Sequence, residues 1–336
     1  MPSTAHNKTD QEIRRIQRAL VVIYAKAKKD VAKAVRAWAA SIENQASKLR
    51  EAIDTAEDEQ AKSAAITAYK QFFLKAVKED KSLARATNTA VSRLYAANVE
   101  AAKYINGKTA AVYARHYNET GKKLQGALGG YSFKAISEKD AADFGEVTQQ
   151  TVNKKKDTAW NKKNISTAIV AGAFMLWGAQ KIADNAAASA AQKNRSGANR
   201  QASDMLTDAE SKGSLDSMWR AYDEGFEEIK KEWVCVFDNR TRDTHIEYND
   251  LGPVDLDYEY APGLSRPRDD NCGDPAEVCN CRCALDFKTV FSQNGTRSAR
   301  EGEVTGSYKN PSSFEGTKSV TVQDMSFEEW MKWRSK

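Results

Sequence analysis

The chain has 336 residues, of which 41% are hydrophobic, with only 18 glycines, 6 prolines and a mean hydropathy of -0.67. This length exceeds the roughly 100 to 200 residues of a typical domain, and the polar composition favours long solvated helices, so a single compact domain is disfavoured. The net charge of +5 is unevenly divided: residues 1–200 contain 34 Lys and Arg against 19 Asp and Glu, whereas residues 201–336 contain 17 against 27.

The basic N-terminal half suits a polyanion or an acidic protein, because Lys and Arg neutralise phosphates without reading sequence. A solvated charged face explains the same excess. Residues 1–10 are polar and do not resemble a secretory signal, so we expect a protein that is made and kept in a cytoplasm. The most apolar run, Ile165–Ala179, is shorter than the roughly 20 residues that span a bilayer, and this predicts a buried helix.

Hydrophobic periodicity predicts long helices in the first part of the chain. Apolar residues from Ile13 to Ile53 recur at steps of three, four or seven, which indicates one face of a long helix. Similar stripes over 66–77 and 91–102 predict antiparallel helical hairpins. The glycine-rich stretch 121–130 breaks this pattern and predicts a boundary.

After this boundary the predicted elements become shorter. Ser137 is expected to cap a short helix, 154–156 to form a basic connector, 165–191 an Ala-rich helix, and 194–200 a turn or hinge. Helical spacing returns over 206–231, and Trp233–Phe237 has the β-branched and aromatic residues of a strand. Residues 292–320 lack periodicity and predict an extended surface segment, followed by a short helix over 326–333.

These patterns predict a mainly α protein, in which long helical hairpins precede a small α+β, Cys-rich module and an extended C-terminal tail. The expected domains are consecutive. They comprise a helical hairpin region over 1–125, a second helical segment containing the apolar helix over 126–200, the Cys-rich module over 201–290, and a tail with a short terminal helix over 291–336.

Four of the five cysteines lie between Cys272 and Cys283, downstream of His245. This clustering predicts a zinc site with ligands from His245, Cys272, Cys279, Cys281 and Cys283. Thiolates bound to one zinc lie roughly 3.8 Å apart, whereas side chains at i and i+2 of a strand lie about 6.6 Å apart, so the segment must bend.

Disulfides or plain buried thiols are the alternatives to a metal. One bridge can close the loop between Cys272 and Cys279, Cys235 can pair across strands, and the odd cysteine count leaves at least one thiol free. The polar residues around Asp238 and His245 can perform acid/base chemistry, with Asp238 orienting the imidazole. Since no nucleophile motif or phosphate-binding loop accompanies them, a structural polar network is favoured.

Two sequence blocks occur in a specific order. The first is Trp233-Val-Cys-Val-Phe-Asp238-Asn-Arg240-Thr241-Arg242-Asp-Thr-His245, and the second is Pro275-Ala-Glu277-Val-Cys-Asn280-Cys281-Arg282-Cys283. Together with the preceding helix and the acidic Gly/Pro loop, they resemble the phage head-morphogenesis, or minor capsid, family of Mu protein F-like proteins. The resemblance covers about residues 200–287.

This resemblance implies a structural head-morphogenesis protein of a tailed phage, with no established enzyme activity. The expected partners are the portal protein and the major capsid protein, with packaged DNA against the basic helical half. The expected location is the virion, at the capsid interior or portal vertex, in more than one copy after assembly in the host cytoplasm. Its motif corresponds to Asp238, Arg240, Thr241, Arg242, His245, Asn280, Cys281 and Cys283, whereas Cys235, Cys272 and Cys279 look like additions.

Two other functions compete with this interpretation. Some family members leave the particle with the genome, and a membrane-active ejection protein would contact the host envelope through 165–191, which is apolar and flanked by lysines. A metal-dependent hydrolase or nuclease would use His245 and the cysteines. This enzyme hypothesis is disfavoured because four-ligand cysteine sites are usually closed to water.

Overall fold

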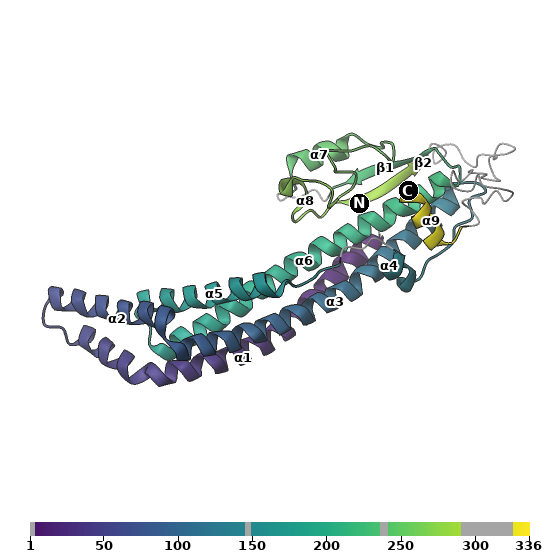
Figure 1. Cartoon of the computed structure of the whole chain (residues 1–336). Helices are drawn as coiled ribbons and strands as arrows, with labels where there is room; N and C mark the ends of the chain where they lie inside the picture. Colours follow the sequence, from purple (N-terminus) through teal and green to yellow (C-terminus); the bar gives the residue numbers. More distant parts are fainter. Residues whose placement is uncertain (1–3, 145–148, 236–240, 290–324) are drawn as a thin grey trace. The chain divides into compact units, whose positions relative to one another are not determined.

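The computed structural model describes residues 4–144, 149–235, 241–289 and 325–336 (Figure 1). Long helices dominate, and the two strands lie near the cysteines, which confirms the predicted fold class. The elements are α1 (Thr4–Asp54), α2 (Glu59–Glu79), α3 (Lys81–Ala127), α4 (Glu138–Phe144), α5 (Lys154–Phe174), α6 (Ala179–Asp223), β1 (Ile229–Val234), α7 (Asp243–Asp250), α8 (Pro275–Val278), β2 (Ala284–Thr289) and α9 (Phe327–Arg334).

The chain divides into two compact units, each built from separate segments of sequence. Unit 1 contains residues 1–15, 105–149 and 200–336, and unit 2 contains residues 16–104 and 150–199. The helices α1, α3 and α6, of 51, 47 and 45 residues, contribute to both units. Composition shifts and turns predict consecutive domains instead, because they indicate where the chain reverses direction. They do not indicate where one long helix leaves the first compact unit and enters the second.

The core of unit 2 is built on the apolar stripe of α1. Its residues Ile16, Leu20, Val31 and Val35 are fully buried, as their periodic spacing predicts. Trp38 extends this core: its ring packs edge-on against Phe73 of α2 at 6.3 Å, and its Nε1 donates to Asp80 at 2.9 Å. The buried face of α1 therefore supplies, through Trp38, both an apolar contact with α2 and a hydrogen bond to the turn between α2 and α3.

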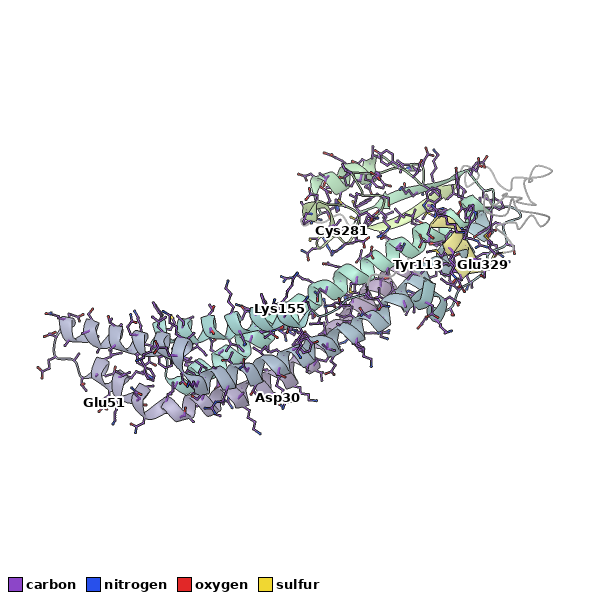
Figure 2. All side chains as sticks on the ribbon, viewed as in Figure 1. Asp30, Glu51, Tyr113, Lys155, Cys281 and Glu329 are labelled. Atoms are coloured by element: carbon purple, nitrogen blue, oxygen red, sulfur yellow. The ribbon has the colours of Figure 1, made fainter. Side chains whose placement is uncertain are left out.

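The apolar run beginning at Ile165 is also buried in unit 2, as expected. Ile165 and Ile169 of α5 and Ile182 of α6 have no exposed area. Exposed side chains occur along the whole length of α5, from Lys155 in the first turn (Figure 2) to Phe174 in the last. Among the described residues, no helix has an apolar stretch long enough to cross a bilayer.

The expectation of one helix over 165–191 is wrong, because the chain reverses between α5 and α6. Leu176 has φ 54, and Trp177 N–H donates to the Gly172 carbonyl at 3.1 Å, which closes the turn. A Cβ on Gly172 would lie 2.9 Å from Ile182, so glycine permits the close approach of the two helices. The lysines at 154–156 open α5 rather than connecting elements, and Asn153 caps it by accepting from Lys156 N–H at 3.0 Å.

The turn predicted at 194–200 is also wrong, because α6 continues through it. The buried Asn194 side chain donates to Asn161 Oδ1 at 2.7 Å and to the Ala190 carbonyl at 2.8 Å. Its Oδ1 accepts from Asn98 at 2.7 Å, and Asn98 also donates to Asp157 at 2.6 Å. Burial of Asp157 raises the pKa of its carboxyl. A polar layer inside unit 2 thus uses residues that local composition assigns to a turn.

In unit 1, α6 ends earlier than its periodicity predicts. Helical spacing predicts a helix to Lys231, but Gly225 adopts φ 98 and its N–H donates to the Tyr222 carbonyl at 2.9 Å, which stops the helix. Ile229–Val234 then forms β1, which pairs antiparallel with β2 in the register Val234↔Ala284. Of the strand predicted over Trp233–Phe237, Trp233 and Val234 form the end of β1 and Cys235 follows it, while residues 236–237 lie outside the described residues.

The terminal helix α9 is anchored in unit 1 by a buried indole. Trp330 is fully buried, and its Nε1 donates to Asp223 of α6 at 2.9 Å. Ser326 caps the helix and forms reciprocal bonds with Glu329, which confirms the predicted helix after residue 326. Figure 2 locates Glu329 on α9. The extended segment predicted over 292–320 lies outside the described residues.

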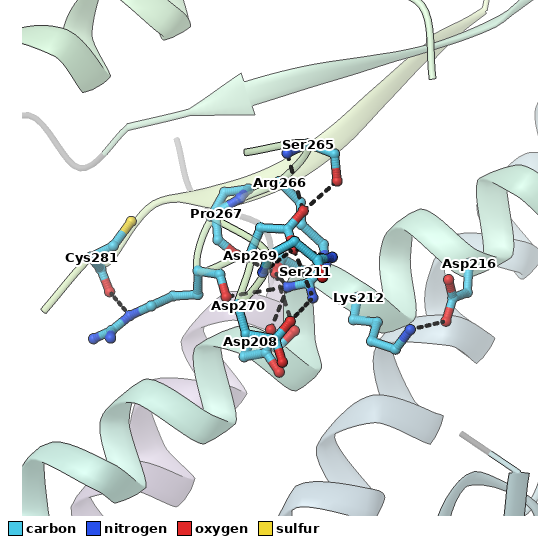
Figure 3. A network of polar contacts seen from close by, with 12 residues as sticks. Asp208, Ser211, Lys212, Asp216, Ser265, Arg266, Pro267, Asp269, Asp270 and Cys281 are labelled. Carbon is cyan, nitrogen blue, oxygen red and sulfur yellow. Dashed lines mark hydrogen bonds and ion pairs between the residues drawn. The ribbon is translucent and has the colours of Figure 1, made fainter. Parts of the chain in front are cut away.

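A buried ionic network joins the loop before α8 to helix α6 (Figure 3). Arg266 is 5% exposed, forms an ion pair with Asp208 of α6, and lies 3.7 Å from Asp269 of its own loop. Ser211 adds a hydrogen bond to the Pro267 carbonyl at 2.5 Å. The network adds polar contacts to a loop that also buries Leu256, Tyr260 and Leu264.

Candidate metal centre

Four elements of unit 1 bring His245 and three cysteines together. Cys235 directly follows β1, His245 lies in the first turn of α7, and Cys281 and Cys283 lie between α8 and β2. Continuing the strand register by one residue places Cys235 opposite Cys283. Their sulfur atoms are 3.6 Å apart. The antiparallel sheet thus sets one half of the site, and α7 supplies the imidazole.

The ligand atoms of His245, Cys281 and Cys283 all lie within 4.8 Å of one another. His245 Nδ1 is 3.4 Å from the Cys283 sulfur and 3.7 Å from the Cys281 sulfur. All three residues are buried, with exposed fractions of 1 to 3%. For tetrahedral zinc, bond lengths near 2.3 Å to sulfur and 2.05 Å to nitrogen imply a sulfur–nitrogen separation of about 3.6 Å. The cluster therefore can bind a metal ion.

A local bend allows the two cysteines at i and i+2 to share this site. Asn280 adopts φ 57, in the left-handed region, immediately before Cys281. Residues 281–283 are not part of β2, which begins at Ala284. The extended spacing that would separate the two sulfurs is therefore absent, and the bend that the sequence requires is present.

The second nitrogen of His245 has its own partner, which fixes the orientation of the ring. His245 Nε2 lies 3.0 Å from the Glu277 carbonyl oxygen and 3.2 Å from Glu277 Oε2. Both partners are acceptors, so Nε2 carries the proton and leaves the Nδ1 lone pair directed at the cysteines. A carboxylate behind a ligating imidazole is the usual support of a zinc-bound histidine.

Hydroxyl groups of α7 hold this carboxylate in place. Thr244 Oγ1 donates to Glu277 at 3.2 Å, and the Tyr248 hydroxyl donates to it at 3.3 Å. Trp233 packs edge-on against His245 at 5.1 Å and against Tyr260 at 4.9 Å. The aromatic rings enclose the imidazole, so the site is positioned before any ion binds.

The three sulfurs at the sheet end differ in acidity. Contacts of the Cys283 sulfur with the sulfurs of Cys235 and Cys281, and with His245, lower the pKa of Cys283. The same contacts, together with burial, raise the pKa of Cys235 and of Cys281. Cys283 is therefore the first of the cluster to become a thiolate, the form that binds metals.

The other predicted ligands lie outside this cluster. Cys272 is buried but its sulfur faces the Asp274 carbonyl at 3.9 Å, and Cys279 is exposed. Of the predicted structural motif, Arg242 donates to the Cys279 carbonyl at 2.5 Å and Asn280 supplies the bend. Thr241 is half-buried just before α7. Asp238 and Arg240 lie outside the described residues.

Sequence reasoning missed the role of Glu277 and left Cys235 out of the predicted metal ligands. Asp238, which the acid/base hypothesis places against His245, lies outside the described residues, and the structure places Glu277 against Nε2. The Pro-Ala-Glu block contains this residue, but its spacing does not indicate an approach to a histidine 32 residues away. Cys235 appears as an addition to the motif, although its position in the strand register identifies it as the neighbour of Cys283.

Comparisons with known proteins assign no family to this site. No protein-family model, curated protein or solved structure matches the chain.

Proposed function

We propose that the chain is a structural head-morphogenesis protein of a tailed phage, whose C-terminal module is fastened by zinc. The observation that supports it best is the convergence of His245, Cys281 and Cys283, which come from the two sequence blocks of the resemblance, on one buried cluster. Arg242 and Asn280 from the same blocks hold the surrounding backbone. Residues that the resemblance singles out thus act together in the fold.

Zinc is the metal that suits these donors. Thiolate and imidazole ligands are soft or intermediate, and together they favour zinc over the hard cations magnesium and calcium. A ligand set from α7 and from the segment before β2 would tie these elements together. The metal would add to the buried polar contacts, such as Arg266 with Asp208, and to the small apolar cluster around Trp233 and Leu264 that already hold the loop between them.

The helical body has a charge distribution consistent with a place beside packaged DNA. Unit 2 contains 24 lysines and arginines against 12 acidic residues. Within 150–199 the only acids are Asp157, which accepts from Asn98, and Asp184, which pairs with Arg36. The exposed lysines of α5 therefore have few carboxylates near them in the sequence, which suits a surface facing phosphates.

The zinc part of this proposal is tested by hydrogen exchange on the full chain. A strong chelator should accelerate amide exchange in peptides covering α7 and residues 275–289, while a thiol reductant alone should leave it unchanged. Cys279→Ser is the matched control, because this exposed cysteine lies outside the cluster and its variant should respond like the parent. Unchanged exchange with chelator, or acceleration by reductant alone, would contradict a zinc fastening.

The head-protein part is tested by locating the chain in particles. Phage heads and procapsids made by cells carrying its gene should still contain the polypeptide after gradient purification. Its density should lie at the portal vertex or on the inner capsid surface. Its consistent absence from particles, with recovery only from the soluble cell fraction, would contradict the structural role. Divalent-dependent DNA nicking lost in His245→Ala would favour the enzyme alternative.

A further inference from the structure

We propose that Cys235 is the fourth metal ligand, so that the centre is a closed Cys3His site. This inference rests on the zinc site proposed above and extends it to a residue outside the two-block motif. Cys235 is 4% exposed and follows β1 directly. Its sulfur lies 3.6 Å from that of Cys283, close to the roughly 3.8 Å between two thiolates on one tetrahedral zinc.

The remaining candidates for a fourth ligand are placed unfavourably. Glu277 contacts Nε2 of His245, on the side of the ring opposite to the Nδ1 atom that faces the cysteines, so its carboxylate cannot reach the same ion. The Cys272 sulfur faces the Asp274 carbonyl, and Cys279 is exposed. Cys235, which follows β1, brings its sulfur into contact with that of Cys283 from the other side of the sheet end.

Metal binding requires one adjustment at Cys235. Its thiol donates to the His245 carbonyl at 2.8 Å, and it is not part of the set whose ligand atoms all lie within 4.8 Å of one another. Coordination removes the thiol proton, so this hydrogen bond is lost and the sulfur is free to rotate toward the ion. All three cysteines bind as thiolates, so each one that is still protonated releases its proton to solvent, the neutral imidazole releases none, and no electron is transferred.

A Cys3His site has consequences for charge and for chemistry. Three thiolates and one Zn2+ leave a net charge of -1, and the buried Arg268 lies beside it, donating from Nε to the Cys281 carbonyl at 3.3 Å. Four protein ligands also leave no coordination position for water. The centre would therefore stabilise the fold and would not activate a nucleophile.

Cobalt substitution of the full chain tests this inference. Co2+ occupies zinc sites, and its thiolate charge-transfer absorption scales with the number of bound sulfurs. Cys235→Ser should lower this absorption by about one third, as three thiolates become two. Cys281→Ser should give the same loss, and Cys272→Ser should give none. Cys235→His keeps a fourth ligand but removes one sulfur, so it should bind cobalt at nearly the parental affinity with the absorption expected for two thiolates. This variant distinguishes the loss of a sulfur ligand from misfolding of the chain.

The outcomes distinguish this inference from the zinc proposal. Full charge-transfer intensity in Cys235→Ser, with a loss in Cys281→Ser, would overturn Cys235 as a ligand but leave a zinc site built on Cys281. Absence of the band in the parental chain would overturn both. A parental chain two mass units lighter than the reduced form, with a Cys235–Cys283 linkage after digestion, would replace the metal by a disulfide and overturn both as well.

Discussion

Removal of the Arg266 guanidinium should strongly destabilise the loop that supports the metal centre. Arg266→Met keeps the length of the side chain but leaves Asp208 and Asp269 buried without their cation. Loss of one partner from a buried ion pair typically costs about 3–5 kcal/mol. This is a large fraction of the about 5–15 kcal/mol that stabilises a domain, so local opening should be readily measured.

The loss should depend on pH, because burial already raises the pKa of Asp208 even with the arginine present. Without Arg266 this pKa rises further, so Asp208 binds a proton more readily in the folded state than in the unfolded state. The destabilisation should therefore be largest near neutral pH and smaller in mild acid, where the carboxyl is neutral. Adding Asp208→Asn to Arg266→Met should recover part of the lost stability at neutral pH.

Hydrogen exchange at several denaturant concentrations measures this effect in peptides covering β1, β2 and the loop. Lys139→Ala is the control, because Lys139 and Asp143 form an exposed ion pair that should contribute almost nothing. If Arg266→Met opens these peptides no more readily than Lys139→Ala does, at neutral pH and at acid pH alike, the network is not what holds the loop.

Two further predictions concern the helices. Gly213→Ala should destabilise unit 1 by about 1–3 kcal/mol, because the new Cβ would lie 2.5 Å from the Tyr113 carbonyl oxygen. Gly107→Ala is the control: this glycine has open space around it, so the substitution should stabilise α3 by up to about 1 kcal/mol. Equal melting temperatures for the two variants would refute the close contact between α3 and α6. Burial raises the pKa of Asp157 in the folded state above its value in the unfolded state, so the parent loses stability as pH rises from about 4 to 7. The Asp157→Asn variant should not show this loss, and its stability relative to the parent should therefore increase over the same range. Parallel pH profiles of the two proteins in urea unfolding would refute a buried carboxyl next to Asn98.

Helix periodicity carried most of the fold prediction because burial follows spacing directly. Ile16, Leu20 and Val35 lie at helical intervals and are all fully buried. The prediction failed where tertiary contacts outweigh local preference. Asn194 has the composition of a turn, yet its buried amide is satisfied by Asn161 and the Ala190 carbonyl, so the helix continues. Local propensity contains no information about such partners.

The candidate site was partly predictable for a related reason. The crowding of His245, Cys281 and Cys283 into two short blocks indicates a built site, and the structure brings these three together. Two features decide which cysteines come together and which stay apart: the bend at Asn280, and the strand register that places Cys235 opposite Cys283. Register depends on pairing between residues 48 positions apart, so spacing along the chain cannot reveal it.

Native mass spectrometry of the full chain, purified without added metal or chelator, tests the central claim most directly. A zinc-fastened module predicts one zinc per folded chain, lost on acidification together with protection of α7 and residues 275–289 from protease. Cys281→Ser should lower the zinc content, and Cys279→Ser should leave it unchanged. A fully reduced, metal-free mass in a chain whose module still resists protease would contradict the claim.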